Sequence, residues 1–159
     1  MILFSRDGSH VEAHIVGYQF PNGQDNWLLV STRISTPHGN GTSVDPCWQT
    51  AEVRRMIAWF SAMTKSASVF DWGGACLEAN LEFELVGATP DTVTIRANFI
   101  LERGIWHPAD GSPDIPDYGG HVDLEVARSS LQRVAHELAD ELRRFPPRKP
   151  ERRLPSPLL

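Results

Sequence analysis

Carboxylates at alternating positions are the residues of this chain that come nearest to an acid–base pair. Glu78, Glu82 and Glu84 share one parity with Asn80, and apolar residues stand between them. Two carboxyl groups can donate and accept a proton when they converge on a substrate in a cleft. In an extended strand these glutamates point to one side, away from the apolar side chains. We therefore interpret them as an acidic solvent face that suits a basic partner, with a catalytic pair as the alternative.

Histidines and cysteines are the other candidates for chemistry. His10 and His14 are four residues apart, which suits zinc on a helix, but their segment is extended and four residues of strand span about 13 Å. Cys47 and Cys76 lack a neighbour at metal-ligand spacing, and a nucleophilic thiol also needs a base. The chain has no phosphate-binding glycine motif and no Gly-x-Ser-x-Gly motif. We predict surface histidines, buried thiols and no catalytic, cofactor or metal site.

A long segment rich in Pro, Gly and Asp combines aromatic and acidic side chains. It contains Trp106, Asp110, Asp114, Asp117 and Tyr118. The aspartates do not have the spacing of an EF-hand calcium loop. Trp and Tyr among acidic residues are typical of the anchors and rim of a protein interface. We predict that this segment binds a protein partner and that the acidic solvent face is a second contact surface. The alternative is an exposed insertion with no binding role.

Charge is distributed unevenly along the chain. The whole chain carries −5, but residues 146–159 hold four basic residues and one acidic residue, so removing their +3 leaves −8 on the rest. A body of this charge repels phosphate backbones, which argues against nucleic-acid binding. The same charge accelerates association with a basic protein.

Length and composition are those of one globular domain. The chain has 159 residues, of which 41% are hydrophobic and 22% charged. No apolar run approaches the roughly 20 residues that span a bilayer, and the first residues lack the basic region of a signal peptide. Two cysteines cannot form a disulfide framework. We expect a cytoplasmic protein with no membrane contact.

Apolar periodicity predicts the elements that position these residues. Alternation predicts strands over residues 11–20, 27–34, 81–85, 93–101 and 122–126, and a short strand around 42–44. Between residues 37 and 41 and between 106 and 120 the composition is that of turns and loops.

Helical spacing appears twice. The first helix begins at Thr50 as N-cap and ends near residues 65–68. The second begins with a capping box of Ser129 and Gln132 and is stopped by Pro146. We infer a single α+β domain over residues 1–146, with an antiparallel sheet of about six strands packed by two amphipathic helices. Residues 147–159 form a flexible, basic, Pro-rich tail.

Several short motifs resemble one bacterial family, the WapI-like immunity proteins. They are Asn26-Trp27-Leu28-Leu29-Val30, Asp45-Pro46-Cys47, Ala58-Trp59-Phe60, the segment Ala75–Glu84, and Phe145-Pro146-Pro147-Arg148. The fourth is similar to the family's Glu-Pro-Asn-Leu-x-Phe signature, with Ala79 where proline is expected. The resemblance covers roughly residues 11–148. It implies a cytoplasmic antitoxin paired with a contact-delivered polymorphic toxin.

The resemblance implies a non-enzymatic protein that neutralises a cognate toxin, often a nuclease, by binding it. Our leading hypothesis is therefore an immunity protein that occludes a toxin domain. The alternative is a regulatory or scaffold module that self-associates, for instance as a homodimer through an unpaired edge strand. A third interpretation is a small hydrolase that uses Glu78 and Glu82 or a Cys–His pair.

Overall fold

Two antiparallel sheets and two helices make up the protein, and the α+β class is confirmed. The computed structural model describes residues 1–20, 22–23, 25–65 and 80–148. The larger sheet has, in spatial order, β1 (Ile2–Phe4), β2 (His10–Tyr18), β3 (Trp27–Thr36), β4 (Gly39–Gln49), β7 (Ile105–Pro108) and β8 (Ile115–Pro116). The smaller sheet has β5 (Leu81–Ala88), β6 (Thr92–Ile100) and β9 (Gly119–Ala127). The helices are α1 (Thr50–Met63) and α2 (Arg128–Arg144).

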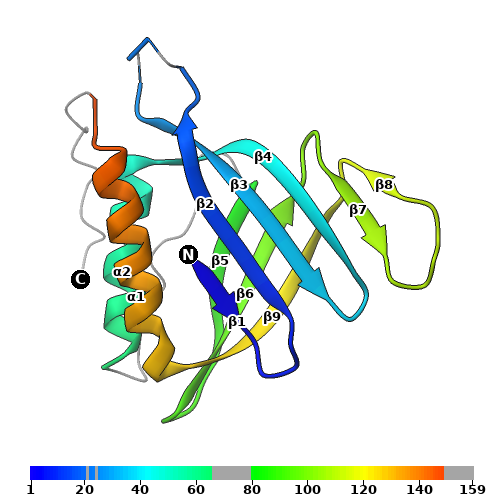
Figure 1. Ribbon diagram of the computed structural model, residues 1–159. Coiled ribbons are helices and arrows are strands. Elements are labelled where there is room, and N and C mark those ends of the chain that lie inside the picture. The colour runs from blue at the N-terminus through cyan, green and yellow to red at the C-terminus, as the bar shows by residue number, and fades with distance from the viewer. Residues whose placement is uncertain (21, 24, 66–79, 149–159) are drawn as a thin grey trace.

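The strands divide between two sheets rather than forming one. Figure 1 shows the larger sheet in front of the smaller one, with α1 and α2 side by side at one end and β7 and β8 at the opposite end. The apolar residues of both sheets and both helices belong to one buried cluster. Each sheet therefore covers the apolar face of the other, and the helices close one side of the core.

Aromatic residues join the layers of this core. The ring of Phe83 on β5 lies 6.5 Å from the ring of Trp48 on β4 and 6.0 Å from that of Phe60 on α1. The indole N–H of Trp48 also donates a hydrogen bond of 2.9 Å to the carbonyl oxygen of Leu81. Because a buried indole needs an acceptor, this bond satisfies Trp48 and links the two sheets.

The fourth strand is much longer than the sequence suggested. Gly39 and Gly41 lie inside β4, where they pair with β3 and with β7. The prediction of a break over residues 37–41 was therefore wrong, since only Pro37 and His38 form the turn. Glycine in a strand marks the close approach of another group, which here is β7 with the Trp106 side chain.

Both helices begin differently from the predicted caps. The N-cap of α1 is Gln49, not Thr50, and the Gln49 N–H donates to the Glu52 carboxylate at 2.6 Å. At α2 the predicted box of Ser129 and Gln132 was wrong, because the helix follows β9 directly and begins at Arg128. The buried guanidinium of Arg128 donates to the carbonyl oxygens of Met63 and Thr89. It thereby satisfies the carboxyl end of α1 and ties it to the β5–β6 turn.

Side chains of α2 cover the outer edge of β1. The N–H of Ile2 donates to the Glu137 carboxylate at 3.1 Å, and its carbonyl oxygen accepts from Arg133 at 3.3 Å. Edge strands present unpaired backbone groups that invite another strand. At the other edge of this sheet, β8 has only two residues and one is proline. Both edges of the larger sheet are therefore poorly suited to strand addition.

Candidate partner-binding surface

The segment predicted to bind a partner is an ordered arm rather than a loop. Residues 105–118, here called the arm, run out along β7, turn, and return along β8. The first strand of the arm extends the larger sheet by pairing with β4, for example Thr42 with Ile105. Figure 1 shows the arm at the end of the molecule away from the helices.

The two aromatic residues of the arm form its base. The rings of Trp106 and Tyr118 are stacked, with centroids 4.8 Å apart and planes 20° apart. Both lie against Phe99 of β6, at 6.0 and 6.1 Å. Trp106 is only 5% exposed, so most of this side chain is used in packing. As a partner-binding residue it can offer only a small area in this conformation, whereas Tyr118 is half-buried.

Two glycines of β4 make room for Trp106. A Cβ at Gly39 would lie 2.8 Å from the Trp106 ring, and one at Gly41 would lie 3.0 Å from it. Each Cβ would also meet a backbone oxygen of β7, at 2.5 Å from His107 and 2.9 Å from Ile105. The glycines therefore let β7 and its indole approach β4 closely. The sequence signal was present in Gly39-Asn40-Gly41, but it has the same composition as a turn.

The three aspartates of the arm are exposed, and each holds a local hydrogen bond. Asp110 accepts from the Ser112 N–H at 2.9 Å, and Asp117 accepts from the Arg103 N–H at 2.8 Å. Asp114 lies 2.7 Å from Nδ1 of His107. Hydrogen bonds from Ser112 hold the pKa of Asp110 below its usual value, so this carboxylate is charged at neutral pH. The arm thus presents fixed negative charges to solvent.

The acidic solvent face lies on the smaller sheet, as parity predicted for its described residues. Leu81 and Phe83 are buried while Glu82 and Glu84 face outward, and Glu84 pairs across the strands with Arg96. Arg96 in turn binds Asp123 of β9 through two bonds, of 2.8 and 2.9 Å. This hydrogen bond lowers the pKa of Asp123 and raises that of Arg96. Glu78 lies outside the described residues.

A groove of about 300 Å³ lies where the arm meets both sheets. Its lining includes Trp106 and Tyr118 of the arm and Asp123 of β9, the partner of Arg96, but none of the glutamates of the acidic solvent face. The rest of the lining comes from β6, from β9, and from the β1–β2 and β3–β4 turns: Asp7, Ser9, Thr36, Pro37, His38, Phe99, His121 and Val122. No sequence pattern predicted that these distant segments meet.

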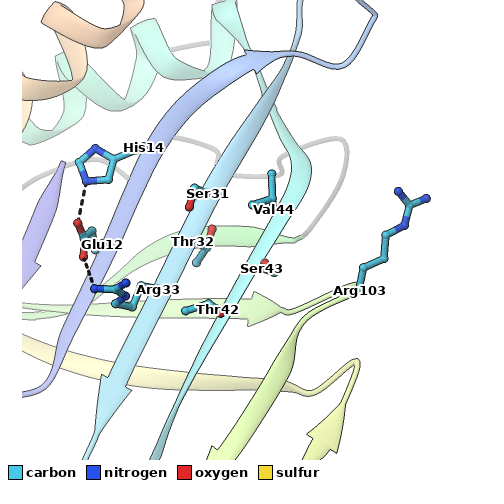
Figure 2. A pocket seen from close by; sticks show the side chains of 9 residues that line it. All are labelled: Glu12, His14, Ser31, Thr32, Arg33, Thr42, Ser43, Val44 and Arg103. Carbon is cyan, nitrogen blue, oxygen red and sulfur yellow. Dashed lines mark hydrogen bonds and ion pairs between the residues drawn. The ribbon is translucent and has the colours of Figure 1, made fainter.

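A second hollow, of about 470 Å³, lies on the outer side of β2, β3 and β4. Figure 2 shows Glu12 between His14 and Arg33, with Arg103 well separated from them. The Glu12 carboxylate is 2.9 Å from Nε2 of His14 and 3.8 Å from the Arg33 guanidinium. The charged groups at this end of the hollow therefore neutralise one another.

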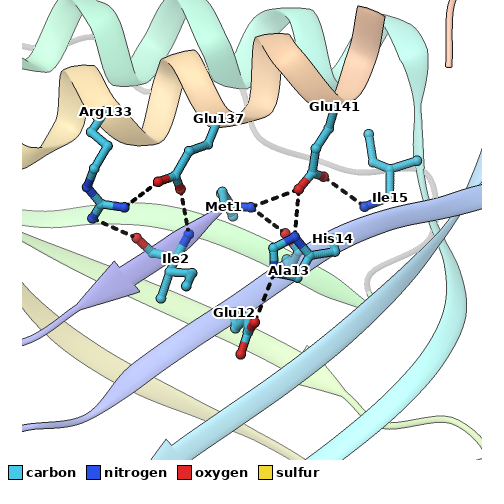
Figure 3. Close-up of polar contacts among 9 residues, drawn as sticks. All are labelled: Met1, Ile2, Glu12, Ala13, His14, Ile15, Arg133, Glu137 and Glu141. Atoms are coloured by element: carbon cyan, nitrogen blue, oxygen red, sulfur yellow. Dashed lines mark hydrogen bonds and ion pairs between the residues drawn. The ribbon is translucent and has the colours of Figure 1, made fainter. Parts of the chain in front are cut away.

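Glu141 of α2 connects this ionic cluster to the core. Figure 3 shows its carboxylate directed at Met1, His14 and Ile15. It lies 3.2 Å from the Met1 ammonium and 2.7 Å from Nδ1 of His14, and it accepts from the Ile15 N–H at 2.8 Å. Burial alone would raise the pKa of Glu141, but these hydrogen bonds and the ammonium charge outweigh it and the pKa is lowered. This cluster fixes α2 to β1 and β2.

The remaining candidates for chemistry are separated in space. His10 packs on the ring of Phe4 at 5.4 Å, while His14 faces Glu12 and Glu141. Cys47 is buried, and Cys76 lies outside the described residues. Among the described residues no three His, Cys, Asp or Glu side chains gather as metal ligands. None of the helices described is both long and apolar enough to traverse a bilayer.

The fold and surface are those of an α+β protein with an acidic arm and a groove at its base. The model of the Immunity protein WapI-like family matches residues 1–146, which is most of the chain. The chain belongs to this family, and the resemblance seen in its sequence is confirmed. No curated protein and no solved structure matches the chain.

Proposed function

We propose that this immunity protein binds a cognate bacterial toxin domain and neutralises it by occlusion, without catalysis of its own. The observation that supports this most strongly is the family match over residues 1–146. A protein of this function acts in the cytoplasm of the cell that makes the toxin. Its interface does not need a catalytic centre, only a surface complementary to the toxin.

The arm and the adjoining acidic solvent face are the proposed contact surface. The exposed carboxylates of Asp110, Asp114 and Asp117 lie on one short segment that Trp106 anchors to the core. Because the arm is held in place, little conformational entropy is lost when it binds. Its clustered negative charges attract a basic partner and accelerate their encounter. A basic toxin is expected because nucleases, one class of such toxins, must themselves attract phosphate backbones.

Occlusion is the proposed mode because an acidic surface can occupy a site that normally binds phosphate. Carboxylates that face the toxin's basic residues would exclude the nucleic-acid backbone by charge and by volume. The net charge of −8 on residues 1–145 favours the same partner.

Co-expression with the toxin domain encoded immediately upstream tests the proposal. Cells that make both proteins should grow, and a variant with Asp110→Lys and Asp114→Lys should protect less well. The matched control is Asp140→Lys on the exposed side of α2, which reverses a charge away from the arm and should protect fully. Growth arrest despite expression of the folded wild-type protein would contradict the proposal.

Self-association through a sheet edge, the alternative function, receives less support. Side chains of α2 occupy the backbone groups of Ile2 at one edge of the larger sheet, and Pro116 shortens the other. A stable homo-oligomer in solution that forms without any toxin would favour this alternative.

A further inference from the structure

We propose that the groove at the base of the arm receives an arginine side chain of the toxin. The inference rests on the proposed function and specifies its central contact. The groove, of about 300 Å³, unites an aromatic wall with the carboxylate of Asp7, whose hydrogen bonds come from neutral donors. The wall, the charge and the rigidity of the rim support it separately.

The aromatic wall supplies a surface on which a planar cation can stack. Phe99, Trp106 and Tyr118 form a triangle of mutually contacting rings, with centroids 4.8 to 6.1 Å apart. Phe99 is 3% exposed and Trp106 5% exposed, whereas Tyr118 is half-buried. All three line the groove. Guanidinium groups bind to aromatic rings through cation–π attraction and stacking, and they are more weakly hydrated than ammonium groups. The half-buried ring of Tyr118 offers the stacking surface, and the rings of Phe99 and Trp106 support it from behind. Stacking on this ring favours arginine over lysine.

Asp7 supplies negative charge to the lining of the groove. Its carboxylate accepts hydrogen bonds from the N–H of Ser9 at 2.9 Å and from the Ser9 hydroxyl at 3.1 Å. These neutral donors lower its pKa, so Asp7 is ionised at neutral pH, and no Lys or Arg in the described part of the chain pairs with it. Asp123 also lines the groove, but Arg96 already binds both of its oxygens.

The described lining contains no lysine or arginine that would compete for this site. Its acidic side chains are Asp7 and Asp123, and its histidines are His38 and His121. Tyr118 contributes its ring. A phosphate or another anion in the groove would be repelled by the carboxylates of Asp7 and Asp123, so the groove does not suit acidic ligands.

The turn that holds Asp7 is fixed in place before any partner arrives. Gly8 has φ of +88°, a conformation that favours glycine, and Ser9 is buried. The N–H of Arg6 donates to the Glu125 carbonyl oxygen at 3.2 Å, while the Glu125 N–H donates to the Ser5 hydroxyl at 3.0 Å. The turn is thus bound to β9 next to Asp123. Such preorganisation reduces the cost of ordering a charged rim on binding.

The chain offers a closely matched control for a test of Asp7. Asp7-Gly8-Ser9 recurs as Asp110-Gly111-Ser112 at the tip of the arm. Both aspartates accept from the serine N–H at 2.9 Å, and both glycines have positive φ, +88° and +78°. Asparagine can keep that hydrogen bond at either position while removing the charge. Asp7→Asn and Asp110→Asn therefore remove the same charge from turns of the same sequence, one at the groove and one on the arm.

The test measures the affinity of each variant for the upstream-encoded toxin domain by calorimetry. Asp7 is exposed in the free protein, and in the proposed complex the toxin's guanidinium would cover it and exclude water from the pair. Asp7→Asn should therefore weaken binding about tenfold or more. Asp110→Asn, at an exposed rim, should weaken binding less than about fivefold. If Asp7→Asn bound the toxin domain as tightly as wild type does, the inference would be overturned and the proposed function would stand. A wild-type protein that does not bind the toxin domain would instead contradict the proposed function.

A double-mutant cycle identifies the arginine. Each arginine of the toxin domain is changed to alanine, which removes its charge, and the affinity of each variant is measured for wild-type protein and for Asp7→Asn. For one toxin arginine, the substitution should weaken binding to the wild-type protein and weaken binding to Asp7→Asn clearly less. This is expected because that arginine and Asp7 contact each other. Fully additive effects for every toxin arginine would overturn the inference.

A titration without toxin tests the groove by itself. N-acetyl-arginine amide, added to isotope-labelled protein, should shift the Trp106 indole and Gly120 amide NMR signals saturably. N-acetyl-citrulline amide, which has the same shape without the charge, should shift them much less, and Asp7→Asn should reduce the arginine response. Shifts of equal size for both compounds, or none near Trp106, would contradict an arginine site.

Discussion

Replacement of Gly41 by alanine should destabilise the protein by displacing β7 and Trp106. A Cβ at this position would lie 2.5 Å from Leu101 Cδ1, 2.9 Å from the Ile105 carbonyl oxygen and 3.0 Å from Trp106 Cε3. The leucine methyl group can rotate away. The Ile105 oxygen cannot, because it belongs to the backbone of a strand that pairs with β4.

The expected loss is about 1–2 kcal/mol in the free energy of unfolding. Overpacking of a filled core by one methyl group costs about 1–3 kcal/mol. A glycine-to-alanine change also reduces the freedom of the unfolded chain, which returns about 0.4–1 kcal/mol. Because the Cβ would contact a backbone oxygen that cannot move aside, we expect the overpacking cost to lie in the upper part of this range.

Urea unfolding followed by tryptophan fluorescence measures this change. Gly17→Ala is the control, since a Cβ at Gly17 on β2 meets nothing within 4 Å and should leave stability unchanged or slightly raised. If Gly41→Ala were as stable as wild type, or if Gly17→Ala lost as much, the close seating of Trp106 on β4 would be refuted.

Three further predictions concern the ionic and polar groups of the fold. Glu141→Gln should cost about 3 kcal/mol at pH 7, the order found when one partner of a buried ion pair is removed. Because the pKa of Glu141 is lowered in the folded state, its stabilisation is present above its ordinary value of 4.5 and is lost as the pH falls through the folded value. Between pH 3 and 7 the melting temperature of the variant should therefore fall less steeply with acidification than that of wild type. An equally steep fall in both proteins would contradict the role of the Glu141 carboxylate. Burial raises the pKa of Asp45, and its Oδ2 has no hydrogen-bond partner among the described residues, so the ionised carboxylate destabilises the fold. Asp45→Asn should therefore raise the melting temperature at pH 7, and this gain should vanish below the ordinary pKa of 3.8. A gain of the same size at low pH would argue against a charge effect. Arg133→Ala should lower stability by about 1 kcal/mol in urea unfolding by leaving the Ile2 carbonyl without its donor, whereas Gln132→Ala on the exposed side of α2 should have little effect.

Local patterns predicted much of the fold because they depend on neighbours in the sequence. The alternation around Phe83 identified the faces of β5, and it correctly directed Glu82 and Glu84 outward opposite β6. The helical spacing located α1 and α2 to within a few residues. Burial of one face imposes these periods, so the sequence reveals them directly.

Contacts between distant segments were not predictable in the same way. Trp106 looked like an exposed interface anchor because its neighbours are polar, yet glycines far earlier in the chain provide its buried seat. Asp7 attracted no attention in the sequence, although it shares a groove with Trp106 and Asp123. Such juxtapositions arise from sheet order and register, which a single sequence leaves open. The repeated Asp-Gly-Ser tripeptides were a signal for turns, but not for what those turns border.

Calorimetric titration of the wild-type protein with the toxin domain encoded beside it tests the central claim most directly. Immunity by occlusion predicts a one-to-one complex with a dissociation constant of about 10⁻⁸ M or lower, weakened by high salt because the partner is basic. The toxin's activity should disappear at the same molar ratio. A folded toxin domain that shows no heat of binding and keeps its activity in the presence of excess protein would contradict the account.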